Sequence, residues 1–164
     1  MKKTPVLFRI GGTIVGVAAL AAAVGPWLAP FDPVSQDLPL RLAGPSFIHP
    51  FGLDELGRDM LARVLAGARI SFLVGLTVVG VSSVLGTFLG AVAGYFGGVL
   101  DEAISRLIDI LLAFPGLLLA IALVAVLGPS LVNVLVALTV IGWVGYARLV
   151  RGQVLRAREL DYVQ

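Results

Sequence analysis

An apolar run without a single charged residue extends from Ile70 to Gly94 and constrains this chain more than any other feature. Within and just after it, small residues recur at every fourth position: Ser82, Gly86, Gly90, Gly94 and Gly98. On a helix these positions form one narrow seam without side-chain bulk. Interior glycines weaken a helix in water by roughly 0.5 to 1 kcal/mol each, whereas in lipid this spacing lets a second helix approach closely. We therefore predict a membrane span whose small-residue seam packs against neighbouring helices.

The composition supports a membrane protein. Hydrophobic residues make up 59% of the 164-residue chain and charged residues 13%, against about 45 to 50% and 25% in soluble domains. The predicted fold class is all-α, a polytopic transmembrane helical bundle with four spans. The net charge of +2 gives no reason to expect a nucleic-acid partner, and without cysteine the chain has no disulfide, no thiolate metal site and no thiol nucleophile.

The first 30 residues read as a short basic tail followed by the first span. Lys2, Lys3 and Arg9 precede an apolar run from Ile10 to Ala29, which is long enough to cross a bilayer. A signal anchor that stays as a span and a cleaved secretory signal both fit this pattern. Proline residues then end the helix.

Residues 31–68 are polar enough to lie in water outside the membrane. Asp54 is a candidate N-cap for an amphipathic helix from Glu55 to Ala68. His49, Asp54, Glu55 and Asp59 could alternatively ligate a metal, but their spacing matches no ligand motif. The prediction is a turn and a helix cap, with no metal site.

The third predicted span runs from Ala103 to Leu127 and contains two anomalies, Asp109 and Pro115. A charged residue within a span is costly and usually pairs or faces water. Asp109 could therefore pair with Arg106 near the interface, or it could face a water-filled path. Pro115 breaks the helix and frees carbonyl groups, which is tolerated best beside other helices or a cavity. Both are candidates for the lining of a translocation pathway.

The fourth predicted span runs from Ser130 to Val150 and follows a turn so short that spans three and four must be antiparallel neighbours. Asn133 and Thr139 either form interhelical hydrogen bonds or line the same pathway. Trp143 and Tyr146 read as interfacial aromatic anchors. The helix is expected to continue beyond the span towards Gln164.

Basic residues flank both ends of the chain. The C-terminal flank contains Arg148, Arg151, Arg156 and Arg158 and matches the basic N-terminal tail. With four spans both termini lie on one side, and the positive-inside rule places them in the cytoplasm.

One long stretch resembles a known family. The segment from His49 to Ser71, HPFGLDELGRDMLARVLAGARIS, is similar to the C-type permease subunits of bacterial ATP-binding-cassette importers for dipeptides, oligopeptides and nickel. Shorter matches are Gly94-Tyr-Phe-Gly-Gly98 with Asp101, then Arg106, Asp109 and Leu112-Ala-Phe-Pro115, and finally the segment from Arg151 to Tyr162. The resemblance extends over essentially the whole chain.

The resemblance implies one half of a two-subunit pore in the bacterial inner membrane. The complete subunit would have six spans, of which four are present here. Residues 69–164 would form the N-terminal part of the family's transmembrane domain, after the tail and first span (1–30) and the external segment (31–68). The implied partners are a second permease subunit in a heterodimer, two cytoplasmic ATPases and an external solute-binding protein. No cofactor is implied, and no P-loop motif occurs in the sequence.

The resemblance also concerns the C-terminal end. The family pattern continues past Tyr162 into a cytoplasmic loop, the EAA motif, which docks into the ATPase, so we expect this chain to be a shortened product. The candidates for ATPase contact are Glu159, Asp161 and Tyr162.

The function predicted from the sequence is therefore that of a permease subunit for di- or oligopeptides, working by alternating access. It is not expected to be an enzyme, because no nucleophile and base pair is present. The alternatives are a self-contained channel or secondary carrier, a permease for nickel or another solute, and an assembly protein without a transport role.

Overall fold

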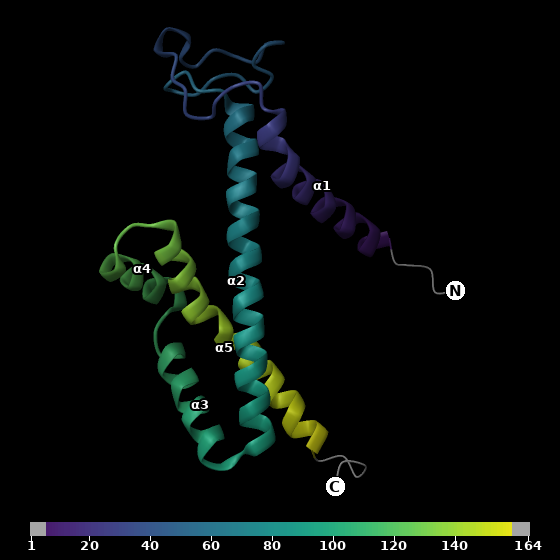
Figure 1. Ribbon diagram of the computed structural model, residues 1–164, viewed down its shortest axis with the longest axis vertical. Helices are drawn as coiled ribbons and strands as arrows, with labels where there is room; N and C mark the ends of the chain where they lie inside the picture. Colours follow the sequence, from purple (N-terminus) through teal and green to yellow (C-terminus); the bar gives the residue numbers. More distant parts are fainter. Residues whose placement is uncertain (1–5, 159–164) are drawn as a thin grey trace. The chain divides into compact units, whose positions relative to one another are not determined.

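The computed structural model describes residues 6–158, and in this part of the chain every regular element is helical (Figure 1). The helices are α1 (Val6–Leu28), α2 (Met60–Phe96), α3 (Gly98–Leu112), α4 (Gly116–Leu127) and α5 (Leu131–Arg158), with a short 3-10 turn, η1 (Leu38–Leu40). Three of them, α1, α2 and α5, are long and apolar enough to cross a membrane, and the bent pair of α3 and α4 makes a fourth candidate. The predicted all-α class is confirmed.

The helices leave most of their apolar surface uncovered. Only 6%, 11% and 22% of the residues in the most apolar windows of α1, α2 and α5 are buried. A helix that is apolar on all sides must be covered by lipid or by other chains. The exposure therefore fits helices that lie in a membrane.

The chain forms two compact units, residues 1–74 and 75–164, and α2 contributes to both. In the first unit α1 packs against the start of α2 through Gly25. A Cβ atom at Gly25 would lie 2.8 Å from Cδ2 of Leu65. A larger residue at this position would require the Leu65 side chain to shift.

The prediction of a separate amphipathic helix from Glu55 to Ala68 is wrong in two respects: the helix starts later, and it is continuous with the membrane span that follows. Gly57 has a φ of +71° and lies directly against the Asp37 carbonyl, so the chain turns there. The helix begins at Met60, and Oδ1 of Asp59 accepts a hydrogen bond from the Ala62 amide at 2.7 Å. Since no proline follows, α2 continues unbroken to Phe96 for 37 residues, about 55 Å at 1.5 Å per residue.

In the second unit the chain reverses sharply after Phe96. Gly97 and Gly98 have φ values of +66° and +55°, a conformation that glycine adopts without strain. Gly98 is therefore the start of α3 rather than the fifth position of the seam on α2, and its prediction as a seam residue is wrong. The following helix also begins five residues before the predicted Ala103.

The predicted third span is broken at Pro115. α3 and α4 meet at 87° across the short link from Ala113 to Pro115. Proline has no amide hydrogen, so the carbonyl of residue 111 loses its helical donor there. With 12 residues, α4 is only about 18 Å long, too short to cross a bilayer alone.

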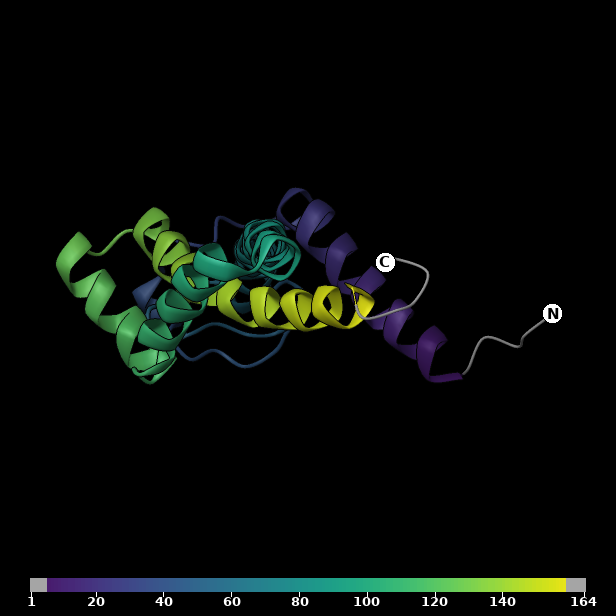
Figure 2. The same ribbon diagram turned by 90° about the horizontal axis from the view of Figure 1, so that it is seen from below.

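α5 runs from Leu131 through the predicted end of its span to Arg158, and it packs against α4 and α3. Figure 1 shows α5 crossing the lower part of α2, and Figure 2 shows α5 passing beside α3. The core of this unit consists of Ile108, Trp143, Val144 and Ala147. Trp143 is 6% exposed, so its prediction as an interfacial anchor is wrong: it fills the space between helices.

Candidate functional site

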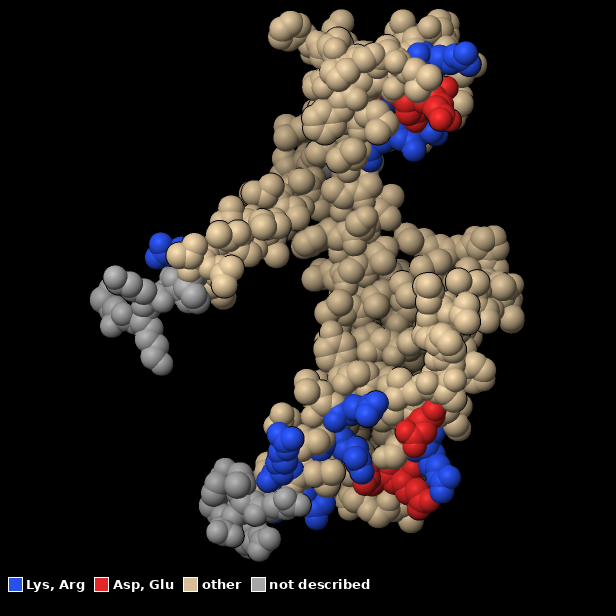
Figure 3. All heavy atoms as spheres, turned by 180° about the vertical axis from the view of Figure 1, so that it is seen from behind, with Lys and Arg blue, Asp and Glu red and all other residues tan. Residues whose placement is uncertain are grey.

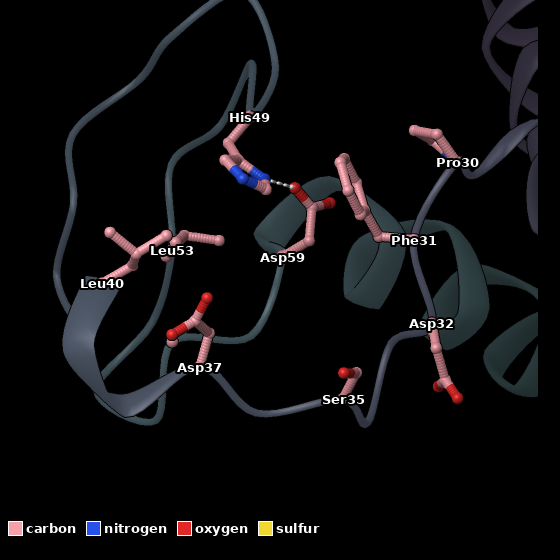
Figure 4. Close-up of a pocket in the computed structure, with 10 residues that line it drawn as sticks. Pro30, Phe31, Asp32, Ser35, Asp37, Leu40, His49, Leu53 and Asp59 are labelled. Carbon is pink, nitrogen blue, oxygen red and sulfur yellow. Dashed lines mark hydrogen bonds and ion pairs between the residues drawn. The ribbon is translucent and has the colours of Figure 1, made fainter.

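The connecting segment, residues 29–59, has an internal structure centred on His49 and Asp59 (Figure 4). Nδ1 of His49 donates a hydrogen bond to Oδ2 of Asp59 at 2.8 Å, and the His49 ring lies 4.6 Å from the Phe31 ring. The other oxygen of Asp59 caps α2. The carboxylate thus fixes the helix start and the loop at the same time.

The acidic residues of this segment do not gather around one point. Oδ2 of Asp54 pairs with Arg58 at 2.7 Å and with Arg63 at 3.3 Å, away from the Asp59 pair. Within residues 6–158 no group of three or more His, Cys, Asp or Glu side chains could hold a metal ion. Asp54 lies in a turn, and the predicted cap is wrong in its residue, because Asp59 rather than Asp54 caps the helix.

Asp54 stabilises the turn that leads into α2. The amides of Leu56 and Arg58 donate to Oδ1 at 2.8 and 3.0 Å, and Nε of Arg58 donates to Oδ2. Partial burial by itself would raise the pKa of Asp54. The hydrogen bonds from the two amides and the Arg58 guanidinium outweigh it and lower the pKa from 3.8 to about 2.

In the second unit the charged residues gather in one region. On the face shown in Figure 3 they lie around the α2–α3 turn, α3 and the C-terminal part of α5, and the rest of this unit shows no charge. One contact in this region joins Asp101 in α3 to Arg151 in α5 through two hydrogen bonds. Nε of Arg151 donates to Oδ1 of Asp101, and Nη2 donates to Oδ2 at 2.7 Å. Such a two-pronged pair fixes orientation as well as distance.

Asp109 lines a polar cavity next to this pair. The cavity is formed by two helices, and its lining residues are Ser105, Ile108, Asp109, Arg148 and Arg151. The predicted partner Arg106 instead donates to Glu102 at 3.2 Å on the exposed side of α3. Asp109 therefore shares its cavity with arginines of α5.

The small residues of α2 face the backbone of α5. A Cβ atom at Gly86 would overlap the Trp143 carbonyl, and one at Gly90 would overlap the Ala147 carbonyl. At one end of the seam Ser82 lies against Gly142 of α5, where an added Cβ atom would be 2.6 Å from the Ser82 Oγ. At the other end Gly94 lies against Val154. Four of the five predicted seam positions thus lie at a close helix–helix contact.

The four candidates for the pathway do not form one cluster. Asp109 lies in the polar cavity and Pro115 at the corner between α3 and α4. Nδ2 of Asn133 donates to the carbonyls of Leu127 and Gly128 at 2.8 and 2.9 Å, so this side chain closes the α4–α5 turn. Thr139 is half-buried in the middle of α5. Their role in a pathway stays a prediction.

Sequence reasoning missed the contacts that α5 makes with the α2–α3 turn. Asp101 and Arg151 are 50 positions apart, and Nη1 of Arg158 donates to the Gly94 carbonyl at 3.1 Å across 64 positions. The available signal was chemical: charges at the ends of membrane helices tend to pair. The predicted ATPase-contact residues Glu159, Asp161 and Tyr162 lie outside the described residues.

Comparison with known proteins gives matches over the whole chain. The family model described as the N-terminal TM domain of oligopeptide transport permease C matches residues 6–45. The model described as the binding-protein-dependent transport system inner membrane component matches residues 86–164. The resemblance noted in the sequence is confirmed by these matches.

Individual relatives agree. The chain is 43% identical over all of its 164 residues to the probable D,D-dipeptide transport system permease protein DdpC of Escherichia coli, covering 55% of that protein. It is 46% identical over 142 residues, 87% of the chain and 44% of the relative, to the dipeptide transport system permease protein DppC of Bacillus subtilis. With DppC of Haemophilus influenzae it shares 41% over 160 residues, 94% of the chain and 54% of the relative. The chain spans about half the length of these curated relatives.

Proposed function

Because the chain belongs to the family of binding-protein-dependent transport system inner membrane components, we propose that it is part of the permease of an ATP-driven importer for di- or oligopeptides. The observation that carries the proposal is the 43% identity to a dipeptide permease over the complete chain. The fold supports it, because the apolar helices include a broken pair, α3 and α4, and broken membrane helices are common where transporters form their pathways.

The proposed partners follow from the family. A second permease subunit would complete the pathway, two ATPases would supply the energy, and an external binding protein would deliver the solute. This chain would bind no nucleotide, which agrees with the missing P-loop motif. Residues 1–30, 31–68 and 69–164 would serve as tail with first span, external segment and pore domain.

We place the pathway near the corner between α3 and α4 and the cavity beside Asp109. Pro115 turns the chain by 87° there, and the cavity between α3 and α5 is lined by the charged side chains of Asp109, Arg148 and Arg151. Asn133 and Thr139 would contribute from α5, whereas the seam would hold α2 against α5.

Reconstitution tests the proposal. The permease, with the partner permease, two ATPases and binding protein of the same importer, is placed in proteoliposomes and supplied with a labelled dipeptide. We expect uptake that requires ATP and the binding protein. Uptake by this chain alone, without ATPases, would identify a channel or carrier instead.

The pathway residues are tested in the same vesicles. We expect the double variant Asp109→Ala with Pro115→Ala to lower uptake about tenfold, because it removes the charge and the helix break together. Glu102→Gln, which changes an exposed carboxylate of α3, is the control. Uptake unaffected by the double variant would remove these two residues from the pathway.

A further inference from the structure

Three residues on one face of α5 hold the turn between α2 and α3. Arg151, Val154 and Arg158 follow one another at helical spacing, and they contact Asp101 and Gly94. We call these five residues the clamp. It joins the end of α2 and the start of α3 to α5, and the hydrogen-bonded residues of α5 lie 50 or more positions further along the chain.

The arginines bind the turn from its two sides. Arg151 forms a two-pronged pair with Asp101, which lies in the first turn of α3, where a negative charge suits the helix dipole. Arg158 donates to the Gly94 carbonyl in the last turn of α2, where carbonyl groups lack helical donors and attract cations. Each charge thus stabilises a helix end and links it to α5.

Between the arginines, Gly94 of α2 packs closely against Val154 of α5. A Cβ atom at Gly94 would lie 2.8 Å from Cβ of Val154 and 3.1 Å from the Arg151 carbonyl. Because Gly94 has no side chain, the Val154 side chain lies directly against the α2 backbone, and α5 cannot slide or tilt against α2 without losing this packing.

The clamp differs from an ordinary surface ion pair. The pair of Glu102 with Arg106 lies within α3, and its side chains are 68% and 76% exposed. Pairs of that kind contribute little. The side chains of Asp101 and Arg151 are 21% and 33% exposed, form two parallel hydrogen bonds and join different helices. Their geometry constrains the relative position of α3 and α5.

We propose that the clamp is the mechanical link that carries a displacement at the end of α5 into α2 and α3. Arg158 directly precedes the predicted ATPase-contact residues, so this inference rests on the proposed function. Asp101 and Arg158 are positioning residues, and Arg151, which also lines the cavity beside Asp109, acts in the clamp through its pair with Asp101. With the clamp intact the three helix ends move as one body, and without it the end of α5 moves alone.

The first test measures transport and ATP hydrolysis in the same proteoliposomes, for the complete importer. In Asp101→Asn and Arg151→Gln, we expect hydrolysis to stay within about twofold while uptake per ATP falls about tenfold. The charge-swapped pair, D101R with R151D, should recover much of the loss. Glu102→Gln changes the neighbouring carboxylate and should alter neither quantity.

Two results would overturn the proposal. One is unchanged uptake per ATP in both single variants. The other is a proportional loss of hydrolysis and uptake without recovery in the swapped pair, since this would indicate a role in folding or assembly only.

The second test needs no transport. The chain contains no cysteine, so Phe96→Cys and Ala157→Cys can carry spin labels at the exposed ends of α2 and α5 in a lipid nanodisc. We expect one narrow distance distribution, broadened by Asp101→Asn with Arg151→Gln and unchanged by Glu102→Gln. A distance distribution that stays narrow in the double variant would refute the clamp. A reconstituted importer of wild-type subunits that takes up no dipeptide would instead refute the proposed function and leave the clamp untouched.

Discussion

At Gly90 the backbone of α5 occupies the space that a side chain would need, since a Cβ atom there would overlap the Ala147 carbonyl. Backbone cannot move aside as a flexible side chain can. We expect Gly90→Ala to lower the free energy of unfolding by about 1 to 3 kcal/mol, as overpacking usually does. Thermal unfolding of the purified chain in detergent measures the change.

Gly80 is the matched control, because a Cβ atom there would contact nothing within 4 Å. Gly80→Ala should leave stability unchanged or raise it by up to about 1 kcal/mol, the usual gain in helix propensity. Equal losses at Gly80 and Gly90 would show that the close contact with α5 does not matter for stability.

At the scale of elements, the turn before α2 should be sensitive to acid. The folded state lowers the pKa of Asp54 from 3.8 to about 2. The stabilisation from this carboxylate is therefore present above about pH 4 and is lost as the pH falls through 2. We expect Asp54→Asn to be less stable than the wild type at pH 5 and the difference to be much smaller at pH 2.

Thermal unfolding between pH 2 and pH 5 measures this difference, and Glu55→Gln, at an exposed neighbouring position, is the control. A gap between wild type and Asp54→Asn that is constant over this range would contradict the assignment of the low pKa to Asp54.

Elements whose cause is local could be predicted from the sequence. Apolar length identifies the membrane helices, and Pro115 marks the break because the missing amide hydrogen is a property of the residue itself. The start of α2 could not be predicted, since Asp54 and Asp59 are equally good N-caps by composition. The choice depends on Gly57, which lies against the Asp37 carbonyl.

The candidate site was predictable in part for the same reason. Regular spacing placed Gly86 and Gly90 on one face of a helix, which is a local property. The same spacing wrongly included Gly98, because the helix ends two residues earlier. The pair of Asp101 and Arg151 depends on how α5 packs against α3, and no local pattern contains that information.

At the scale of the whole molecule, the proposed orientation in the bacterial inner membrane places residues 29–59 outside and the α2–α3 turn in the cytoplasm. The absence of cysteine allows a direct check. We expect a membrane-impermeant maleimide to label Glu55→Cys from outside intact cells and Glu102→Cys only after the membrane is opened. The opposite pattern would contradict the positive-inside assignment.

The small buried fraction of α1, α2 and α5 means that the hydrocarbon chains of the lipid act as a further partner in this fold. Their length sets how far the 37 residues of α2 must tilt to stay covered, so thin and thick bilayers impose different tilts on the same polypeptide. The free energy of unfolding therefore depends on the surrounding lipid or detergent as well as on the protein. Values measured in a short-chain detergent and in a long-chain lipid refer to different states.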